Sequence, residues 1–211
     1  MKLYKYKSLK NFEHIADIIC NKRFYTVPFY DLNDPMEGLF NYHPETKKKY
    51  LDDIKEGKKK LRICSFSEDP LNILLWAHYA DGFKGICIEV EINDAPLDFD
   101  IKKVEYVSTR LLFHNKASHM ISVLPEMILS QKAKSWSVEK EVRLLSNNQY
   151  IRDGIKITGI LLGVSIPDIL KKALTQLAAP DVQIRETYIG DTNKIEIGPL
   201  INRASQIQTQ R

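Results

Sequence analysis

The chain has 211 residues, of which 44% are hydrophobic and 27% are charged, a composition typical of a globular protein. It has no run of ~18 apolar residues, as a membrane-spanning helix requires, and its first residues alternate instead of forming the apolar core of a signal peptide. The three cysteines, Cys20, Cys64 and Cys87, are widely spaced and odd in number, which favours reduced thiols over a disulfide framework. We therefore expect a cytoplasmic protein without a membrane partner.

The net charge of +4 is concentrated in one segment, 47–62. This lysine-rich segment favours either a patch that contacts the phosphates of a nucleic acid or a solvated helix and loop. Tyr50 is its single aromatic residue, so interleaved rings for base stacking are lacking. The second interpretation is therefore preferred, and nucleic acid stays an open partner.

Hydrophobic periodicity and turn residues predict strands and helices in an irregular order. The predicted elements are, in chain order, a strand over 3–7, a helix over 11–21, a strand over 23–27, a turn-rich loop over 30–38, a strand over 61–66, a helix from 69 to about 80, a strand over 84–91, a helix over 118–132, and strands over 141–145 and 158–164, then a helix over 167–178 and a strand over 182–189. Because there is no regular βαβ repeat, we predict an α+β fold with mixed, mostly antiparallel sheets and flanking helices. Residues 1–202 are expected to form one domain, and 203–211 a frayed polar tail.

Two early segments carry candidate site residues. On the opening strand, Tyr4 and Tyr6 share one face while Lys5 points to the other, so one of the two faces is available for a ligand. In the loop that follows, Asn33 and Asp34 precede Pro35, which suits a tight turn held by side-chain hydrogen bonds to the backbone. Glu37 is not needed for that turn and is a candidate to orient a hydroxyl or an amine.

A third candidate segment lies around the helix that begins near residue 69. Asn72, Trp76 and Tyr79 follow helical spacing and form a stripe of an amide and two rings, an unusual composition for a core face. Rings with a polar group suit contact with a nucleobase or nicotinamide. Three nearby polar residues complete the predicted binding set: Ser67, His78 and Lys84.

The fourth candidate is the segment from Trp136 to Leu145. On a strand, Glu139, Glu141 and Arg143 lie on one face, so they form either a surface ion-pair ladder or an acid–base and anchoring set. Neighbouring carboxylates raise each other's pKa, which suits catalysis, and Glu141 is the preferred catalytic residue. The chain has no HExxH, paired CxxC, P-loop or GxGxxG motif, so neither a metal nor a Rossmann cofactor is predicted.

Several motifs together resemble a widespread bacterial family catalogued as a domain of unknown function. They are LYKYKSL, LNDPME, CSFSE, NILLWAHYADGFKGICIEV and KSWSVEKEVRLL, spread over residues 3–165. This resemblance implies an intracellular bacterial domain.

The order of elements is also similar, more remotely, to ADP-ribosyltransferases, a resemblance that implies a split-sheet fold. It implies that Lys5 or Tyr6 helps to hold NAD, that Ser67 supports the nicotinamide ribose and that Glu141 assists transfer. The first strand of that superfamily usually carries Arg or His, and the predicted first strand of this chain has Lys5 or a tyrosine instead. The leading hypothesis is an NAD-consuming transferase or glycohydrolase with a toxin-like or phage-defence role, in which Lys5, Lys84 or Arg143 meets the diphosphate. The alternatives are a non-catalytic nucleotide or nucleic-acid binding module, and a metal-dependent nuclease that uses Asp34, Glu37, Glu139 and Glu141.

Overall fold

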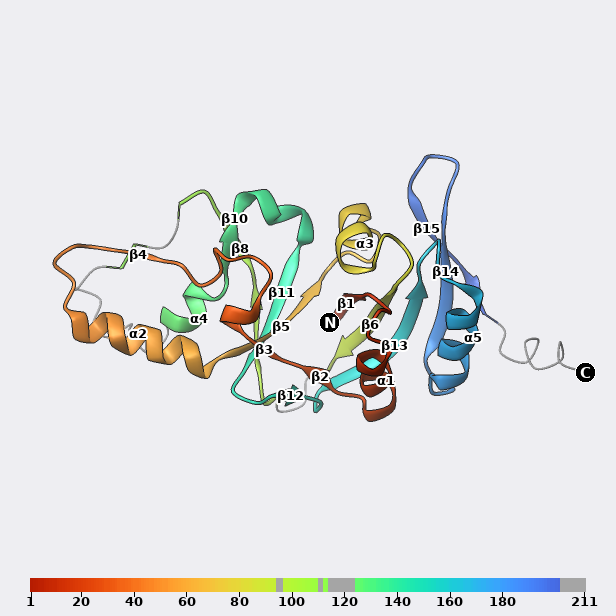
Figure 1. The fold of residues 1–211 in the computed structure, drawn as a ribbon, viewed down its shortest axis with the longest axis horizontal. Helices are drawn as coiled ribbons and strands as arrows, with labels where there is room; N and C mark the ends of the chain where they lie inside the picture. The colour runs from red at the N-terminus through yellow and green to blue at the C-terminus, as the bar shows by residue number, and fades with distance from the viewer. Residues whose placement is uncertain (94–96, 110–111, 114–123, 202–211) are drawn as a thin grey trace, which may run out of the picture. The chain divides into compact units, whose positions relative to one another are not determined.

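A computed structural model describes residues 1–93, 97–109, 112–113 and 124–201 (Figure 1). The chain divides into two compact units, each assembled from separate stretches. The first unit contains residues 1–23, 66–96 and 152–211, and the second contains residues 24–65 and 97–151. Because the chain passes between the units several times, no linker marks their boundaries in the sequence, which predicted one domain over 1–202. The predicted tail, 203–211, lies outside the described residues.

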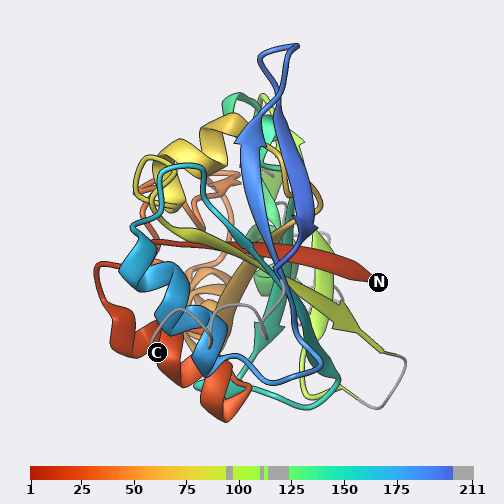
Figure 2. The same ribbon diagram turned by 90° about the vertical axis from the view of Figure 1, so that its right-hand side faces the viewer.

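The first unit is an antiparallel sheet with one parallel pair of strands and three helices. Its elements are β1 (Lys2–Lys7), α1 (Phe12–Asn21), the end of β5 (Arg62–Ser67), α3 (Ile73–Tyr79), β6 (Ile86–Ile92), β13 (Ile155–Leu162), α5 (Asp168–Leu177), β14 (Gln183–Ile189) and β15 (Ile195–Leu200). The strand order is β15-β14-β13-β6-β1, and β1 also pairs with the end of β5. Only β13 and β14 run parallel in this set. Figure 2 shows the β14–β15 hairpin and the neighbouring helices α1 and α5.

The core of the first unit follows from an apolar strand and an amphipathic helix. The strand β6 places Ile86, Ile88 and Val90 in the interior, and each is fully buried. The helix α1 contributes a stripe at Ile15 and Ile18, as its helical spacing predicts. These elements hold β1 in place and therefore fix the first predicted site segment.

The second unit contains most of the shorter strands. Its elements are β2 (Phe24–Tyr25), β3 (Val27–Pro28), a 3₁₀ helix (Phe29–Asp31), β4 (Asn41–Tyr42), α2 (Lys48–Lys60), the start of β5, β7 (Asp100–Lys103), β8 (Glu105–Val107), β9 (Leu112–Phe113), α4 (Leu124–Ile128), β10 (Gln131–Ala133), a second 3₁₀ helix (Lys134–Glu139), β11 (Glu141–Ser146) and β12 (Tyr150–Ile151). The strand β11 lies between β5 and β7 in the sheet order, and β3 pairs with β5. The pairs β8–β10, β4–β9 and β2–β12 stand apart.

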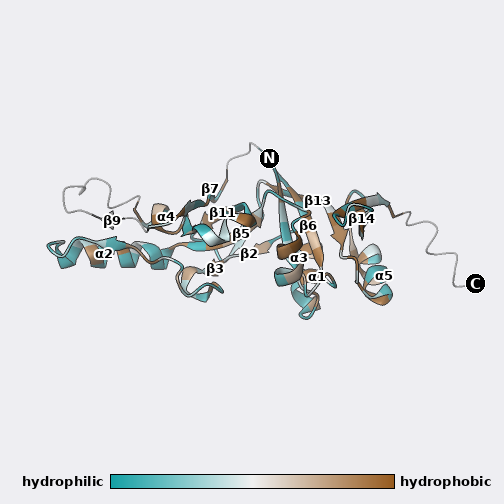
Figure 3. Ribbon diagram, turned by 90° about the horizontal axis from the view of Figure 1, so that it is seen from above, coloured by the Kyte–Doolittle hydropathy of each residue, from teal (hydrophilic) through white to brown (hydrophobic). Residues whose placement is uncertain are grey.

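The lysine-rich segment forms the helix α2, which is hydrophilic over most of its length (Figure 3). Its inward side is narrow and carries Ile54 and Lys58. The Lys58 ammonium donates a hydrogen bond to the Gly38 carbonyl at 2.7 Å and lies 5.0 Å from the ring centres of Phe29 and Phe40. One of the lysines that the sequence assigned to a basic patch is therefore part of the interior.

The α+β class with mixed, mostly antiparallel sheets is confirmed, whereas the split-sheet layout stays a prediction. Two predicted helices differ from the structure. The helix expected from residue 69 begins at Ile73, because the Asn72 side chain caps it. Of the helix expected over 118–132, residues 118–123 lie outside the described residues, 124–128 are helical, and 131–132 belong to a strand. Among the residues that the structure describes, none form a helix long and apolar enough to cross a membrane.

Candidate functional site

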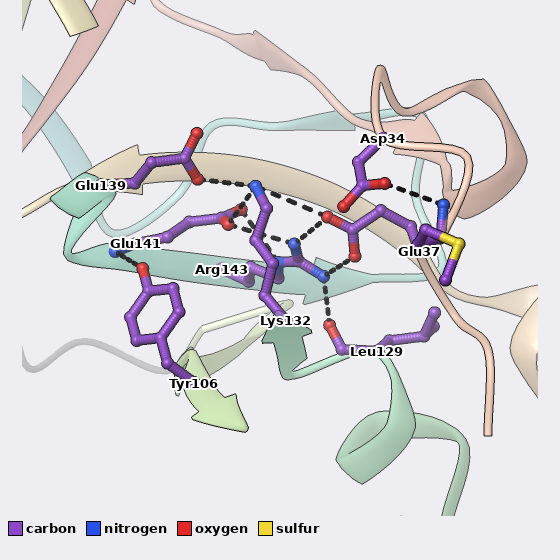
Figure 4. Close-up of polar contacts among 9 residues, drawn as sticks. Asp34, Glu37, Tyr106, Leu129, Lys132, Glu139, Glu141 and Arg143 are labelled. Carbon is purple, nitrogen blue, oxygen red and sulfur yellow. Dashed lines mark hydrogen bonds and ion pairs between the residues drawn. The ribbon is translucent and has the colours of Figure 1, made fainter. Parts of the chain in front are cut away.

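Five buried charged side chains of the second unit meet in one place, here called the charge cluster (Figure 4). Its members are Glu37, Lys132, Glu139, Glu141 and Arg143, and none of their side chains is more than 7% exposed. They come from the early loop, from β10, from the 3₁₀ helix Lys134–Glu139 and from β11. The structure thus brings together two of the four candidate segments and adds a lysine that the sequence did not single out.

Arg143 is the central donor of the charge cluster. Its guanidinium donates two hydrogen bonds to Glu37, at 2.7 and 2.9 Å, and two to Glu141, at 2.9 and 3.1 Å. A further bond of 2.7 Å reaches the carbonyl of Leu129. All five N–H groups of the guanidinium are therefore used, in the fork geometry that arginine offers to carboxylates.

Lys132 is the second cation and lies among three carboxylates. Its ammonium is 2.6 Å from Glu139, 3.2 Å from Glu141 and 3.6 Å from Glu37. It also lies 4.9 Å from the ring centre of Trp136. Burial alone lowers the pKa of Lys132, but the neighbouring carboxylates outweigh burial and hold this pKa above its usual value. The lysine is therefore charged at neutral pH.

Glu141 is held in its ionised form. Burial acts to raise its pKa, but Arg143 and Lys132 together with a hydrogen bond from Ser65 outweigh that effect and lower the pKa to about 2. Tyr106 lies next to it, because the backbone N–H of Glu141 donates to the Tyr106 hydroxyl oxygen at 2.7 Å. Burial raises the pKa of Tyr106 to about 12, so its hydroxyl keeps its proton.

The local backbone explains why the charged side chains converge. Glu139 ends the 3₁₀ helix, and Lys140 then takes a left-handed conformation with φ of 45°. This single residue turns the chain into β11, where Glu141 and Arg143 share one face while Val142 and Leu144 are fully buried. The prediction that Glu139 lies on the same strand is therefore wrong, although all three predicted side chains contact the cluster.

The early loop delivers Glu37 through a tight turn. The Asp34 carboxylate accepts a hydrogen bond from the Met36 N–H at 2.8 Å, and the Glu37 N–H donates to the Asp34 carbonyl at 3.0 Å. Gly38 follows with φ of 70°, and a Cβ at this position would lie 2.9 Å from the Phe29 ring. The turn predicted from Asn33, Asp34 and Pro35 thus sets the direction of Glu37. Asn33 itself is exposed.

The charge cluster is unbalanced. Counted over the described residues alone, three carboxylates of the cluster face two cations, an excess of one negative charge. Burying ion pairs costs desolvation free energy, and such networks are often no more stabilising than apolar residues of similar volume. A surplus charge makes the cost larger. Stability alone therefore gives a poor account of the cluster.

The aromatic stripe of the first unit packs into the core, whereas the sequence predicted that it binds a ligand. Trp76 is fully buried, its indole N–H donates to the Pro70 carbonyl at 2.9 Å, and its ring meets Tyr6 edge to face at 5.3 Å. Phe83 stacks against the same ring at 6.4 Å, and Tyr79 packs against this core. The expectation that Trp76 offers a face to a base is corrected, because tertiary contacts occupy the ring and satisfy its polar group.

The remaining predicted residues lie in the first unit with various exposures. The Tyr6 hydroxyl donates to the Asp69 carbonyl at 2.7 Å and accepts from the Asn72 N–H at 3.3 Å. The Asn72 side chain accepts from two N–H groups at the start of α3, so the residue is a helix cap. Three further residues differ in exposure: Ser67 is buried, whereas His78 and Lys84 are exposed.

The strand β1 carries the two remaining candidate site residues, and both are partly exposed. Tyr4 and Lys5 are half-buried, and the Lys5 ammonium lies 5.0 Å from the ring centre of Phe66. Tyr4 packs against the same core cluster as Tyr6, as their shared face requires. Within the described residues, no group of three or more His, Cys, Asp or Glu side chains has the geometry to hold a metal ion. In the cluster, the ammonium of Lys132 occupies the point where the carboxylates meet.

Lys132 and Tyr106 are not among the residues that the sequence predicts for a site. Lys132 was placed at the end of a helix, and the short strand β8 that carries Tyr106 was not predicted. The sequence did carry a signal, because the predicted site residues Glu37, Glu139 and Glu141 outnumber Arg143, and three buried carboxylates require more than one cation.

No family model, no curated protein and no solved structure matches the chain. Membership of the bacterial family therefore stays a prediction from its motifs.

Proposed function

We propose that the protein is an NAD-consuming enzyme, an ADP-ribosyltransferase or NAD glycohydrolase, and that the charge cluster is its reacting site. The observation that carries the proposal is that, within the part of the chain that the structure describes, the three buried carboxylates Glu37, Glu139 and Glu141 share two cations. The reaction it suits is one that develops positive charge on the substrate, since fixed charges in a water-poor site stabilise opposite charge strongly.

Cleavage of NAD at the nicotinamide ribose meets that requirement. The C–N bond breaks, its electron pair goes to the ring nitrogen, and the cationic pyridinium becomes neutral nicotinamide. The positive charge moves to the ribose carbon, which resembles an oxocarbenium ion in the transition state. A hydroxyl of water or of an acceptor then attacks this carbon and loses its proton. Nicotinamide needs no proton to leave, so carboxylates that stay ionised are well suited to this step.

The protonation states of the cluster fit these roles. Glu141, with its pKa near 2, is a weak base but supplies a fixed negative charge whose orientation Arg143 determines. Glu139 is the last residue of the 3₁₀ helix, and the two residues before it, Ser137 and Val138, are exposed. A single helical turn therefore separates its carboxylate from solvent. We assign Glu139 to the contact with the ribose and Glu141 to the electrostatic support of that contact. The Tyr106 hydroxyl is a protonated donor beside them.

The test is release of nicotinamide from NAD by the purified protein, measured by liquid chromatography with and without cell extract as a source of acceptors. Glu139→Gln and Glu141→Gln should each lower the rate by at least ~100-fold, because each removes a charge that acts in the transition state. Glu45→Gln is the matched control, since the Glu45 side chain is 87% exposed. A wild-type protein that releases no nicotinamide under either condition contradicts the proposal.

A further inference from the structure

One carboxylate oxygen of the loop that carries Glu37 is buried and makes no hydrogen bond to any residue that the structure describes. Asp34 is 8% exposed, and its Oδ1 accepts from the Met36 N–H. Its Oδ2 has no hydrogen-bond partner among the residues that the structure describes. Nearly all buried polar atoms in native proteins are satisfied, so an exception of this kind asks for an explanation.

The position of this oxygen relates it to the cluster. Asp34 is three residues before Glu37 in the same tight turn, and the Glu37 N–H donates to the Asp34 carbonyl at 3.0 Å. Figure 4 draws the Asp34 carboxylate with one oxygen bonded to a backbone N–H and the other on the side of the Glu37 carboxylate. The turn itself uses only Oδ1, so Oδ2 is not required for the local fold.

The chemistry of the oxygen restricts what it can accept. An ionised carboxylate is an acceptor only, so its partner must be an O–H or N–H donor. The adjoining cluster already carries surplus negative charge, which disfavours an anionic group at this point and favours a donor attached to a cationic ring. The carboxamide of nicotinamide has both properties, because it offers two N–H donors and is attached close to the positively charged ring nitrogen.

We propose that Asp34 is a specificity residue of the enzyme, and that its Oδ2 accepts a hydrogen bond from the carboxamide N–H of the nicotinamide ring. This inference rests on the proposed function and names the part of the substrate that the early loop recognises. It predicts that the acid analogue of NAD, in which a carboxylate replaces the carboxamide, is rejected. The analogue has no donor for Oδ2 and brings a second negative charge against Asp34, and a buried group left without its partner discriminates strongly.

The experiment compares NAD with nicotinic acid adenine dinucleotide on the full chain. Binding is measured by the ligand-induced shift of the thermal unfolding midpoint, which does not require turnover. The wild type should bind NAD at least ~100-fold more tightly than the acid analogue, a ratio in the range expected for an unpaired buried group. Asp34→Asn keeps the acceptor for Met36 N–H but replaces the charged Oδ2 by an amide nitrogen. In this variant the preference should fall to less than ~5-fold.

Two controls separate folding from recognition. Asp31→Asn changes an exposed carboxylate at the start of the same loop and should leave the preference unchanged. In the absence of ligand, Asp34→Asn should unfold at the same temperature as the wild type or higher, because Oδ2 makes no contact that the fold uses. A lower midpoint would assign Asp34 to structure instead.

The outcomes distinguish the inference from the proposed function. Preference for NAD without any release of nicotinamide supports Asp34 as a recognition residue and contradicts the enzymatic proposal. Release of nicotinamide with equal binding of NAD and its acid analogue supports the enzyme and overturns the inference. Binding of neither ligand, or a preference that Asp34→Asn retains, also overturns the inference.

Discussion

The two units contain two buried clusters that the sequence predicted as parts of a site, and they differ in how their polar groups are satisfied. In the first unit, Trp76 and Tyr6 pack edge to face, and each polar group has a backbone partner. Among the described residues of the second unit, the carboxylates Glu37, Glu139 and Glu141 face two cations, and one oxygen of Asp34 has no hydrogen-bond partner.

This difference gives a physical criterion for separating core from site. A buried aromatic ring whose polar group is satisfied lowers the free energy of the folded state and needs no other explanation. A buried network with surplus charge costs free energy that its own contacts do not recover, so a ligand of opposite charge is its natural complement. Aromatic residues near polar ones are therefore weaker evidence for a site than unbalanced charge is.

The largest effect is expected from Arg143→Met. The substitution leaves Glu37 and Glu141 buried without their main partner, and removal of one member of a buried ion pair costs about 3–5 kcal/mol. Urea unfolding at pH 7 measures the change. The matched control is Lys102→Met, which removes a partly exposed ion pair with Glu126 at 3.1 Å and should cost about 0–1 kcal/mol. Equal losses of stability in the two variants would mean that Arg143 is not the main partner of the buried Glu37 and Glu141.

The next effect is a pH dependence of stability. Glu141 has a pKa near 2 in the folded protein against an ordinary value of 4.5, so it stabilises the fold above about pH 4.5. That contribution, about 3 kcal/mol from the difference between the two pKa values, is lost as the pH falls from about 5 toward 2. Unfolding free energies measured between pH 7 and 3 should therefore fall less steeply in Glu141→Gln than in the wild type. Glu45→Gln, whose side chain is 87% exposed, should leave the slope unchanged.

A smaller loss is expected from Trp76→Phe. The change removes the indole N–H that bonds the Pro70 carbonyl and leaves a small cavity, at a cost of about 2 kcal/mol. Because the ring is fully buried, the KM for NAD should not change when the assay temperature is well below the unfolding midpoint. A KM for NAD that rises several-fold in the folded variant would mean that the aromatic stripe binds the ligand after all.

The smallest effect concerns Asn72, which the sequence assigned to a binding site. Its side chain accepts from Leu74 N–H at 3.0 Å and Leu75 N–H at 3.3 Å, so Asn72→Ala should lower stability by about 1 kcal/mol. Asn72→Asp keeps the capping oxygen and should retain most of the stability. If both variants unfold like the wild type yet bind NAD more weakly, the residue contacts the ligand.

The elements that were predicted well have strong local patterns. The apolar run around Ile88 marks β6, and the helical stripe at Ile15 and Ile18 marks α1. Glu37 was identified because the predicted turn does not require it, and Glu141 and Arg143 because they share one face of the predicted strand. Their convergence was not predictable, because it depends on pairings between strands far apart in the chain. Lys132 was missed for the same reason, since only the folded sheet places its ammonium among the carboxylates.

The central claim, that the surplus negative charge of the cluster is complementary to a cationic ligand, is tested most directly by comparing two ring charges. The probes are a carbocyclic analogue of NAD, whose bond to nicotinamide is not cleaved, and its reduced form with a neutral ring. Titration calorimetry on the wild type should give at least ~10-fold tighter binding of the cationic ring, and Glu139→Gln should remove most of this preference. Equal affinity for the two rings, or a preference that Glu139→Gln does not alter, would contradict the account.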